Sequence, residues 1–521
     1  MERIEAIVIG AGPAGLSAAV EMAKRGMKTV VFDENAKPGG QLFKQIHKFF
    51  GSKEHRARVR GFKIGEELLR EAEEAGVKVL LNATVVGIYP EKEVVVRIGE
   101  ETKHYKANAI LIACGASENA VTFPGWTLPG VIGAGAAQTM MNLYHMQPGK
   151  RVLMLGTGNV GLVVSYQLIQ AGCEVVALVD ALPRVGGYGV HAAKVARTGV
   201  PFYMNHTIVR AHGDQCVTAV TIGKIGKDGQ IIAGSEKIFE VDTICLAVGV
   251  SPMNQLAKTA GVKMHELPQG DSIVCDENGC TSIEGIYAAG DVSGIEEASS
   301  AMIEGKITGI TIAMDFGYIE ETEAEQEKQK LLDALHNLRT GMFAPCNRGK
   351  KIEFTEEGIP VSENLLKEGY LTDEEVSLYP GITKRAGIHP VIECTQNIPC
   401  NPCQDVCPKK CIKVGKIITS LPQLDEQNQC TGCGMCVASC PGQAIFLVNE
   451  SEQDAMVSMP YEFYPLPEKD EIGFACGRNG KKICEAQVVS VKNVSAFDQT
   501  KVLTIRVPKE YAMKARFYKR K

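Results

Sequence analysis

The order of apolar and polar positions predicts an α/β chain in which one unit occurs twice. Apolar residues fill Ile4 to Ile9 and again Thr29 to Phe32, with a helix-compatible run between them. The segments Val152 to Leu155 and Glu174 to Val179 repeat this order of strand, helix and strand. Short apolar runs joined through a helix are typical of parallel βαβ units. We therefore expect two Rossmann-like dinucleotide-binding domains.

Each of the two units contains a glycine loop with the spacing of a phosphate-binding turn. The first glycine permits the tight turn, the second lets the backbone approach a pyrophosphate, and the third lets helix and strand pack closely. The following helix adds free N–H groups and a partial positive charge. The candidate binding residues are Gly10, Gly12, Pro13, Ala14 and Gly15 in the first loop, and Gly156, Gly158, Asn159, Val160 and Gly161 in the second.

An acidic residue ends the second strand of each unit. Asp33 lies 18 residues after Gly15, where a carboxylate can accept hydrogen bonds from a ribose diol, and Glu34 is its alternative. Asp180 holds the same place in the second unit, which favours a free 2′-hydroxyl and hence NAD over NADP. The alternative is a second site that is empty or that holds a non-redox nucleotide such as ATP or ADP.

Three further segments indicate which group of dinucleotide-binding proteins the chain resembles. Gly40 and Gln41 follow the first acid, a strand over Ala109 to Ala113 leads to Gly115, and Gly290-Asp291 follows a buried strand and precedes a helix-like run, Ala298 to Met314. Together with the glycine loops, these features resemble the FAD-dependent pyridine nucleotide-disulfide oxidoreductase-like superfamily over about residues 1–315. The resemblance implies that Gly290 and Asp291 bind the FAD ribitol and that the following helix points its positive end at the flavin.

Thiol–disulfide chemistry is disfavoured, because neither the CxxC nor the CxxxxC of that superfamily's disulfide reductases is present at the expected places. A closer resemblance rests on Asp33 to Gln41, Gly115 to Glu118 and Phe123 to Val131. These runs are similar to the family of the hydrogen cyanide synthase B subunit and of the opine oxidase and dye-linked L-proline dehydrogenase α subunits. The resemblance implies a subunit that handles electrons while a separate FAD-containing subunit oxidises the C–N bond of an amino or imino acid. No catalytic acid or base stands out.

Cysteine is unevenly distributed, and its clustering predicts iron–sulfur chemistry. Of the 18 cysteines, nine fall between residues 394 and 440. The run from Cys430 to Cys440 has the spacing C-x2-C-x2-C-x3-C-P of bacterial ferredoxins. The run from Cys394 to Cys407 ends in the same Cys-Pro but has five residues in its first gap. We therefore expect two [4Fe–4S] clusters.

The ligands follow from matching the two runs at their Cys-Pro ends, since the cysteine before proline reaches the neighbouring cluster. One cluster is then assigned Cys394, Cys400, Cys403 and Cys440, and the other Cys430, Cys433, Cys436 and Cys407. The longer first gap leaves a different ligand in place of Cys394 as an alternative. Cys411 takes the small apolar position of the usual sequence and is predicted to be structural.

The motifs divide the chain into five parts. We expect a discontinuous FAD-binding domain over 1–116 and 247–315 and an NAD-type Rossmann domain, 117–246, inserted in it. A helical or irregular connector, 316–391, contains Cys346, for which a structural and a functional role are equally open. A ferredoxin-like domain with two [4Fe–4S] clusters covers 392–450. A small β-rich unit over 451–521 turns at Asn479-Gly480 and again near Phe497-Asp498.

Composition and charge bear on the cellular location of the protein and on the partners it can bind. The formal net charge of −5 disfavours nucleic-acid binding. No signal-like start or long apolar run is seen, which predicts a cytoplasmic protein without a membrane span. We expect an FAD/iron–sulfur electron-transfer subunit of a hetero-oligomeric dehydrogenase for proline, hydroxyproline, an opine or a similar compound. Its expected partner is an FAD-containing catalytic subunit, with a further small iron–sulfur subunit or ferredoxin as a second candidate. The alternatives are a self-sufficient NADH:acceptor (ferredoxin) oxidoreductase, and an electron conduit with a non-redox adenine nucleotide.

Overall fold

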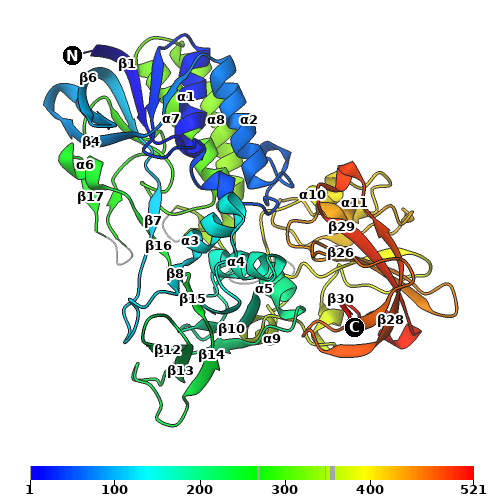
Figure 1. Ribbon diagram of the computed structural model, residues 1–521. Coiled ribbons are helices and arrows are strands. Elements are labelled where there is room, and N and C mark those ends of the chain that lie inside the picture. Colours follow the sequence, from blue (N-terminus) through cyan, green and yellow to red (C-terminus); the bar gives the residue numbers. More distant parts are fainter. Residues whose placement is uncertain (1, 267–269, 346–347, 352–357) are drawn as a thin grey trace. The chain divides into compact units, whose positions relative to one another are not determined.

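The computed structural model describes residues 2–266, 270–345, 348–351 and 358–521 (Figure 1). Cys346 and parts of the expected connector lie outside these ranges. The described residues form two compact units. Unit 1 takes them from Met1–Phe49, Glu54–Asn119 and Gly249–Arg339, and unit 2 from Phe50–Lys53, Ala120–Val248 and Thr340–Lys521. The chain therefore leaves unit 1 after Asn119 and returns to it at Gly249, as an inserted second Rossmann domain requires.

The core of unit 1 is a seven-stranded sheet in the order β3-β2-β1-β6-β5-β4, in which β19 also pairs with β6. β1, β2, β3, β6 and β19 are parallel, while β4 and β5 form an antiparallel extension. The strands are β1 (Glu2–Ile9), β2 (Thr29–Phe32), β3 (Lys78–Leu80), β4 (Ala83–Tyr89), β5 (Glu93–Ile98), β6 (Glu101–Ile112) and β19 (Ile286–Ala288). Two short pairs complete the unit, β7 (Ala116–Glu118) with β16 (Val250–Pro252) and β17 (Met264–His265) with β18 (Ser272–Ile273).

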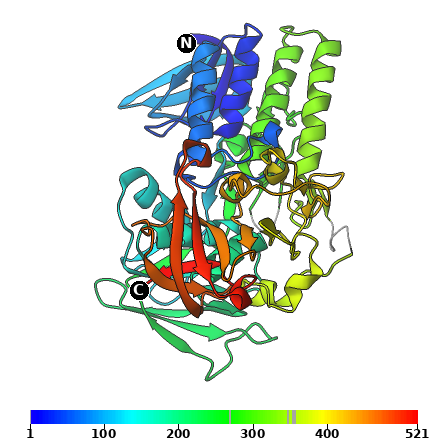
Figure 2. The ribbon, with the colours of Figure 1, turned by 90° about the vertical axis from the view of Figure 1, so that its right-hand side faces the viewer.

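Helices α1 (Pro13–Lys24), α2 (Gly61–Glu74), α7 (Ala298–Asp315) and α8 (Glu321–Leu338) lie together in unit 1, as both views show (Figures 1 and 2). α1 and α7 approach closely because glycines face small residues. A Cβ atom on Gly305 would lie 2.1 Å from the Ala14 carbonyl oxygen, and one on Gly309 would lie 2.6 Å from that of Ala18. The short helix α6 (Gln255–Thr259) lies apart from these four helices (Figure 1). The helix expected after Asp291 is therefore confirmed, and it is packed against the helix of the glycine loop.

Unit 2 contains the second Rossmann sheet, a parallel sheet in the order β11-β10-β9-β15-β8. Its elements are β8 (Val131–Gly133), α3 (Ala134–Gln138), β9 (Arg151–Leu155), α4 (Asn159–Gln170), β10 (Glu174–Asp180), α5 (Gly189–Ala196), β11 (Phe202–Met204) and β15 (Thr243–Leu246). A three-stranded antiparallel sheet of β12 (His206–His212), β13 (Ala219–Lys224) and β14 (Lys237–Glu240) interrupts this order. The repeated βαβ unit predicted from the hydrophobic pattern is thus present in both units.

The C-terminal part of unit 2 is organised by one antiparallel sheet in the order β22-β25-β26-β29-β28-β27-β30, part of which faces the viewer in Figure 2. Its strands are β22 (His389–Ile392), β25 (Ile445–Asn449), β26 (Ala455–Tyr461), β27 (Ile472–Cys476), β28 (Lys482–Lys492), β29 (Lys501–Val507) and β30 (Phe517–Arg520). The turns expected at Asn479-Gly480 and near Phe497-Asp498 do separate strands. The sheet also joins the segments 392–450 and 451–521, which the sequence treats as separate parts.

The remaining elements of unit 2 are short. They are α9 (Glu363–Glu368), α10 (Pro402–Asp405), α11 (Met435–Ser439) and the strand pairs β20 (Thr340–Gly341) with β21 (Lys350–Lys351) and β23 (Ile412–Lys413) with β24 (Gln423–Leu424). Helix α10 contains Cys403 of the first cysteine run, and α11 contains Cys436 of the second. Strand β23 is only two residues long. The chain turns back after it, and a Cβ atom on Gly415 would lie 2.6 Å from the Ser420 hydroxyl oxygen.

Candidate functional site

The first glycine loop joins β1 to α1 and leaves an open space at its centre. Gly10 has a φ of +109°, and a Cβ atom there would lie 2.3 Å from the Ala113 carbonyl oxygen. A Cβ atom on Gly15 would lie 1.9 Å from the Gly10 carbonyl oxygen. By contrast, a Cβ atom on Gly12, the N-cap of α1, would meet nothing within 4 Å. The outer two glycines are therefore required by packing, and the middle one leaves room for a ligand.

The second loop, between β9 and α4, has nearly the same geometry. Gly156 has a φ of +111°, and its Cβ atom would lie 2.2 Å from the Ala247 carbonyl oxygen. A Cβ atom on Gly161 would lie 2.1 Å from the Gly156 carbonyl oxygen, and one on Gly158 would meet nothing within 4 Å. Both loops thus present a helix N-terminus beside an open glycine, which is the arrangement that binds a pyrophosphate.

The acid at the end of each second strand is bonded to the loop of its own unit. One carboxylate oxygen of Asp33 accepts the Ala11 N–H at 2.7 Å, and one of Asp180 accepts the Thr157 N–H at the same distance. Asp33 is buried, whereas its neighbour Glu34 is exposed. An ionised carboxylate has about four acceptor positions, so each acid can fix its loop and also accept a ribose hydroxyl. Of the two acids, Asp33 is therefore better placed than Glu34 to accept a hydrogen bond from a ribose hydroxyl.

The glycine pair after the first acid packs against the first loop. The Gly39 N–H donates to the Ala11 carbonyl oxygen at 2.6 Å. A Cβ atom on Gly40 would lie 3.0 Å from the Gly12 Cα atom. Gln41, which follows in the same turn, has an exposed side chain. The pair is needed for the approach of two backbone segments, a role that the sequence alone did not indicate.

A corresponding pair, Gly186-Gly187, was missed by the sequence analysis. The Gly187 N–H donates to the Thr157 carbonyl oxygen at 2.9 Å, and a Cβ atom on Gly187 would lie 2.8 Å from the Asn159 nitrogen. The signal was present in the spacing, because the pair begins six residues after Asp180, as Gly39 does after Asp33. The internal repeat therefore includes the loop, the acid and the glycine pair.

The turn at Gly290-Asp291 follows β19 and is held by hydrogen bonds from later residues. Gly290 has a φ of +80°, and its N–H donates to a carboxylate oxygen of Glu304 at 2.9 Å. A carboxylate oxygen of Asp291 accepts the Glu296 N–H at 3.2 Å. The buried Arg339 guanidinium bonds both Glu296 and Glu304. This charge network was not predicted, since its members are far apart in the sequence.

Gly115, the remaining predicted flavin contact, follows β6. Its φ is +72°, and a Cβ atom there would meet nothing within 4 Å. Like Gly12, Gly115 has open space beside it. Unlike Gly12, it has a positive φ, which favours glycine. The predicted FAD residues at the carboxyl ends of β1, β2, β6 and β19 all lie in unit 1, where ligands bind in sheets of this kind.

The first cysteine group consists of Cys394, Cys400, Cys403 and Cys440. Burial is the main reason that the pKa of the Cys400 thiol lies well above its ordinary value, and the thiols of the other three raise it further. Burial also raises the pKa of the Cys394 thiol to about 12, with a further contribution from Cys440. The structure therefore brings Cys440 to the other run, as the Cys-Pro rule predicts.

The second cysteine group consists of Cys407, Cys430, Cys433 and Cys436. Burial raises the pKa of the Cys436 thiol, and the thiols of the other three raise it further. The Cys430 sulfur accepts the Gly432 N–H at 3.3 Å, and the Cys407 sulfur accepts the Cys411 N–H at 3.2 Å. Cys411 itself is buried. Both predicted sets of four are thus assembled.

The donor chemistry of these groups fits iron–sulfur clusters. Four thiols with backbone N–H donors to sulfur are the usual surroundings of a [4Fe–4S] cube, whose iron stabilises the thiolates. In the part of the chain that is described, no three Cys, His, Asp or Glu side chains lie close enough to hold a single metal ion. A four-iron cube is larger than one ion and takes its ligands farther apart. Both groups therefore suit a cluster.

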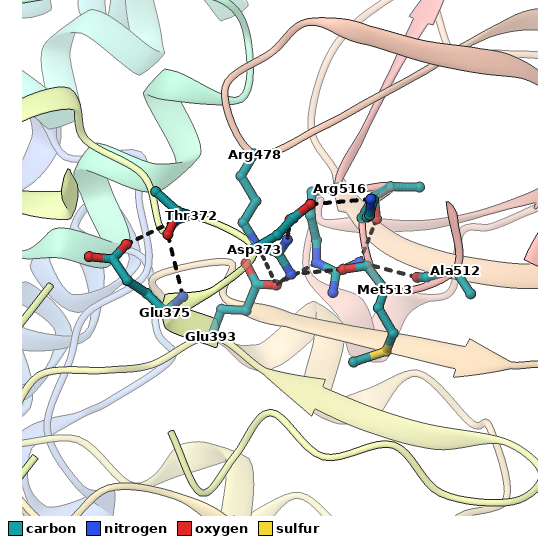
Figure 3. Close-up of polar contacts among 10 residues, drawn as sticks. Thr372, Asp373, Glu375, Glu393, Arg478, Ala512, Met513 and Arg516 are labelled. Carbon is teal, nitrogen blue, oxygen red and sulfur yellow. Dashed lines mark hydrogen bonds and ion pairs between the residues drawn. The ribbon is translucent and has the colours of Figure 1, made fainter. Parts of the chain in front are cut away.

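The surroundings of the first group are buried and charged. Glu393, next to Cys394, bonds Arg478 at 2.6 Å and Arg516 at 2.5 Å, and Figure 3 shows the two guanidinium groups converging on this carboxylate. Burial alone would raise the pKa of the Glu393 carboxyl, but the two arginines outweigh it and hold the pKa at about 2. Arg197 donates to the Gln443 carbonyl oxygen at 2.9 Å and acts electrostatically on Cys440. Three buried cations thus lie near this group.

Two family models match separate parts of the chain. The model described as "Pyridine nucleotide-disulphide oxidoreductase" matches residues 4–305, which is more than half of the chain. The chain belongs to this family. A second model, "4Fe-4S binding domain", matches residues 426–446, which hold the run from Cys430 to Cys440. The protein is therefore an FAD-dependent oxidoreductase with an iron–sulfur domain.

The chain is also similar to several individual proteins. The chain is 27% identical to the A-type subunit of opine oxidase from Rhizobium meliloti over 380 residues, which cover 66% of this chain and 72% of the relative. It is 26% identical to "Hydrogen cyanide synthase subunit HcnB" of Pseudomonas aeruginosa over 367 residues, covering 66% and 79%. Thioredoxin reductase of T. acidophilum has a similar fold, with a TM-score of 0.51, 23% identity, and coverage of 61% of this chain and 99% of that one. The family resemblance stated from the sequence is thereby confirmed. Among the described residues, no helix has the length and hydrophobicity to cross a membrane.

Proposed function

We propose that this chain is the electron-transferring subunit of a hetero-oligomeric amino- or imino-acid dehydrogenase, with FAD at the first loop, NAD(H) at the second and two [4Fe–4S] clusters. The observation that carries the proposal is the presence, in one chain, of two matching nucleotide loops and two four-thiol groups. When bound, a flavin exchanges electrons with nicotinamide in pairs and with iron–sulfur clusters singly. Such a chain therefore suits a path between a hydride carrier and one-electron carriers.

The residues of unit 1 would bind and orient the FAD. The open space at Gly12 and the N-terminus of α1 suit the pyrophosphate, and Asp33 suits the adenosine ribose. The turn at Gly290-Asp291, held by Glu304, suits the ribitol. These groups bind and position; no described side chain is assigned proton transfer.

The residues of unit 2 would bind NAD(H) and the clusters. Gly158 and Asp180 repeat the roles of Gly12 and Asp33, and an acid at this place favours the unphosphorylated ribose. The segment Phe50–Lys53 belongs to unit 2, and its Gly51 pairs with Cys400 of the first cysteine group.

The need for a partner rests on the relatives. Two of them are named as subunits, one of opine oxidase and one of hydrogen cyanide synthase. An opine is an N-substituted amino acid, so its oxidation acts on a C–N bond. We extend this to the present chain, with a separate FAD-containing subunit carrying the amino- or imino-acid chemistry. Proline, hydroxyproline and opines are the substrates we propose for the complex.

The test is an anaerobic NADH titration of the purified chain, followed by visible absorbance, with two matched variants. Gly12→Ala and Gly158→Ala each place a methyl group in open space at a residue with negative φ, so neither clashes with the fold. Each methyl group takes the volume where a pyrophosphate would lie. We expect Gly12→Ala to purify without flavin, and Gly158→Ala to keep flavin and iron but to lose bleaching by NADH.

Each alternative gives a different result. If NADH bleaches nothing in the wild type while dithionite bleaches flavin and clusters, the second loop is not a nicotinamide site and the proposal is wrong there. Bound ATP or ADP would then support the conduit alternative. If the isolated chain alone oxidises an amino acid, no catalytic partner is needed. Rapid NADH-dependent reduction of ferredoxin without any partner would support the self-sufficient reductase.

A further inference from the structure

The second cysteine group opens to the surface of unit 2. A cavity is lined by five cysteines together with Lys409, Pro408 and Thr431; the cysteines are Cys407, Cys411, Cys430, Cys433 and Cys436. Of the eight predicted ligands, Cys433 alone is exposed. Pro408, Lys409 and Thr431 are exposed as well, so one wall of this cavity faces solvent. A cluster held there would be accessible to another protein.

Lysines border this opening. Lys409 lines the cavity, Lys410 follows it and is exposed, and the Lys492 ammonium donates to the Gly432 carbonyl oxygen at 3.1 Å. We call Lys409, Lys410 and Lys492 the basic rim. All three have exposed side chains. The rim brings three cations to the one predicted cluster site with an exposed ligand among the described residues.

The acidic groups nearby only partly offset this charge. Asp425 is buried and is already paired with Lys413. Asp405 and Glu426 are the exposed acids in the same stretch of chain. Because the whole chain carries a net charge of −5, a positive rim is a local departure from the average. Local charge of this kind steers the encounter with a partner of opposite sign.

We propose that the basic rim is the docking surface for a small acidic protein that carries one electron at a time. The inference rests on the proposed function, since it assumes a cluster at the second group. In each encounter one electron leaves the reduced chain and converts the carrier from its oxidised to its reduced form, and no bond or proton is transferred. The cluster at the second group is then the last electron carrier within the chain, and it passes the electron to the docked protein.

The test uses the reconstituted full-length chain, reduced with a stoichiometric amount of dithionite and mixed in a stopped-flow instrument with an oxidised carrier. Acidic rubredoxin and basic cytochrome c serve as the two probes. The rim variant is K409Q/K410Q/K492Q. The matched control is K24Q/K28Q/K78Q, which changes the charge equally at exposed lysines of unit 1.

At low ionic strength we expect the rim variant to reduce rubredoxin about tenfold more slowly than the wild type, because steering by a few charges changes association rates by about this factor or more. Cytochrome c should be reduced at an equal or higher rate. The control should leave both rates within about twofold, since none of its lysines lines the cavity. Added salt should slow the wild type with rubredoxin and bring it toward the rim variant.

The proposal is overturned if the rim variant reduces rubredoxin as fast as the wild type, or if both carriers are slowed equally. EPR of the reduced variant shows whether both clusters are present. If the triple variant has lost a cluster, Lys410→Gln alone and the salt dependence of the wild type decide: a wild-type rubredoxin rate that does not fall with salt overturns the docking surface. Because dithionite supplies the electrons, failure of NADH to bleach the chain would overturn the proposed function without affecting this result.

Discussion

The two cysteine groups have the same ligand chemistry and opposite surroundings. The first is next to Glu393, whose carboxylate is shared by two buried guanidinium groups, whereas the second has the exposed Cys433 and a rim of lysines. Ferredoxin-type spacing alone would give two similar sites. The difference comes from the rest of unit 2, which covers one site and leaves the other open.

The cover of the first group comes from distant parts of the chain. Arg197 follows α5 of the second Rossmann domain, and Arg478 and Arg516 belong to the C-terminal sheet region. Burial lowers the pKa of the Arg516 guanidinium to about 10, even though Glu393 opposes that shift. Glu393 pairs with two of these cations, so the three arginines together leave a net positive charge beside the first group. We expect them to favour the reduced, more negative state of a cluster.

The largest expected effect is the loss of a whole cluster. In the proposed assignment, Cys403→Ser removes a ligand of the buried group, and Cys433→Ser removes the matching ligand of the open group. Each should lower the iron content from about eight to about four atoms per chain and abolish a different EPR signal. Iron analysis with EPR of the reduced protein measures both. If the two variants lose the same signal, the assignment of the groups is wrong.

A second large effect is expected in stability, and it should be confined to the buried group. Arg478→Met removes one of the two cations bound to Glu393 and leaves that carboxylate buried with only Arg516. Breaking a buried ion pair in this way costs about 3–5 kcal/mol of unfolding free energy. Denaturant unfolding of the holoprotein, followed by far-UV circular dichroism, measures it. A loss below about 1 kcal/mol, the level of an exposed pair, would show that these charges are solvated and that the contrast between the groups is overstated.

A smaller effect is expected in redox potential. Arg197→Gln removes a positive charge that acts on Cys440 of the first group. The potential of that cluster should fall on the order of tens of millivolts, as for one charge at intermediate distance in a protein interior. The second cluster should be unchanged, and Arg197→Lys should restore most of the value. A redox titration read by EPR measures these potentials. If Arg197 acts through its charge, Arg197→Lys restores the potential; if its role is purely structural, keeping the charge need not restore it.

Much of this arrangement could be predicted from local pattern. The glycine loops, Asp33 and Asp180, and the two cysteine sets follow from fixed spacings, and the structure brings each set together. Gly186-Gly187 could also have been found, because the spacing from Asp180 repeats that from Asp33. Such features are readable because their chemistry requires residues close together in the sequence.

The contrast between the two groups could not be predicted in the same way. Glu393 meets Arg478 and Arg516 only after strands much later in the chain have paired in the C-terminal sheet. Likewise, Arg339 reaches Glu296 and Glu304 only when α8 packs against α7. Isolated arginines have no spacing that marks them as buried. The environment of a site depends on such long-range packing, while its ligands do not.

The smallest expected effect on stability is at the open group, where an ion pair with an exposed lysine can be removed as a counterpart to the buried pair. Lys413 pairs with Asp425, but its side chain is 66% exposed, so water already solvates the charge that the pair would stabilise. Asp425 also accepts the backbone N–H groups of Gln427 and Asn428, which hold its turn without the lysine. Lys413→Met should therefore leave the unfolding midpoint unchanged within error, in contrast to Arg478→Met. A destabilisation equal to that of Arg478→Met would mean that both groups depend on their ion pairs alike, and that exposure does not separate them.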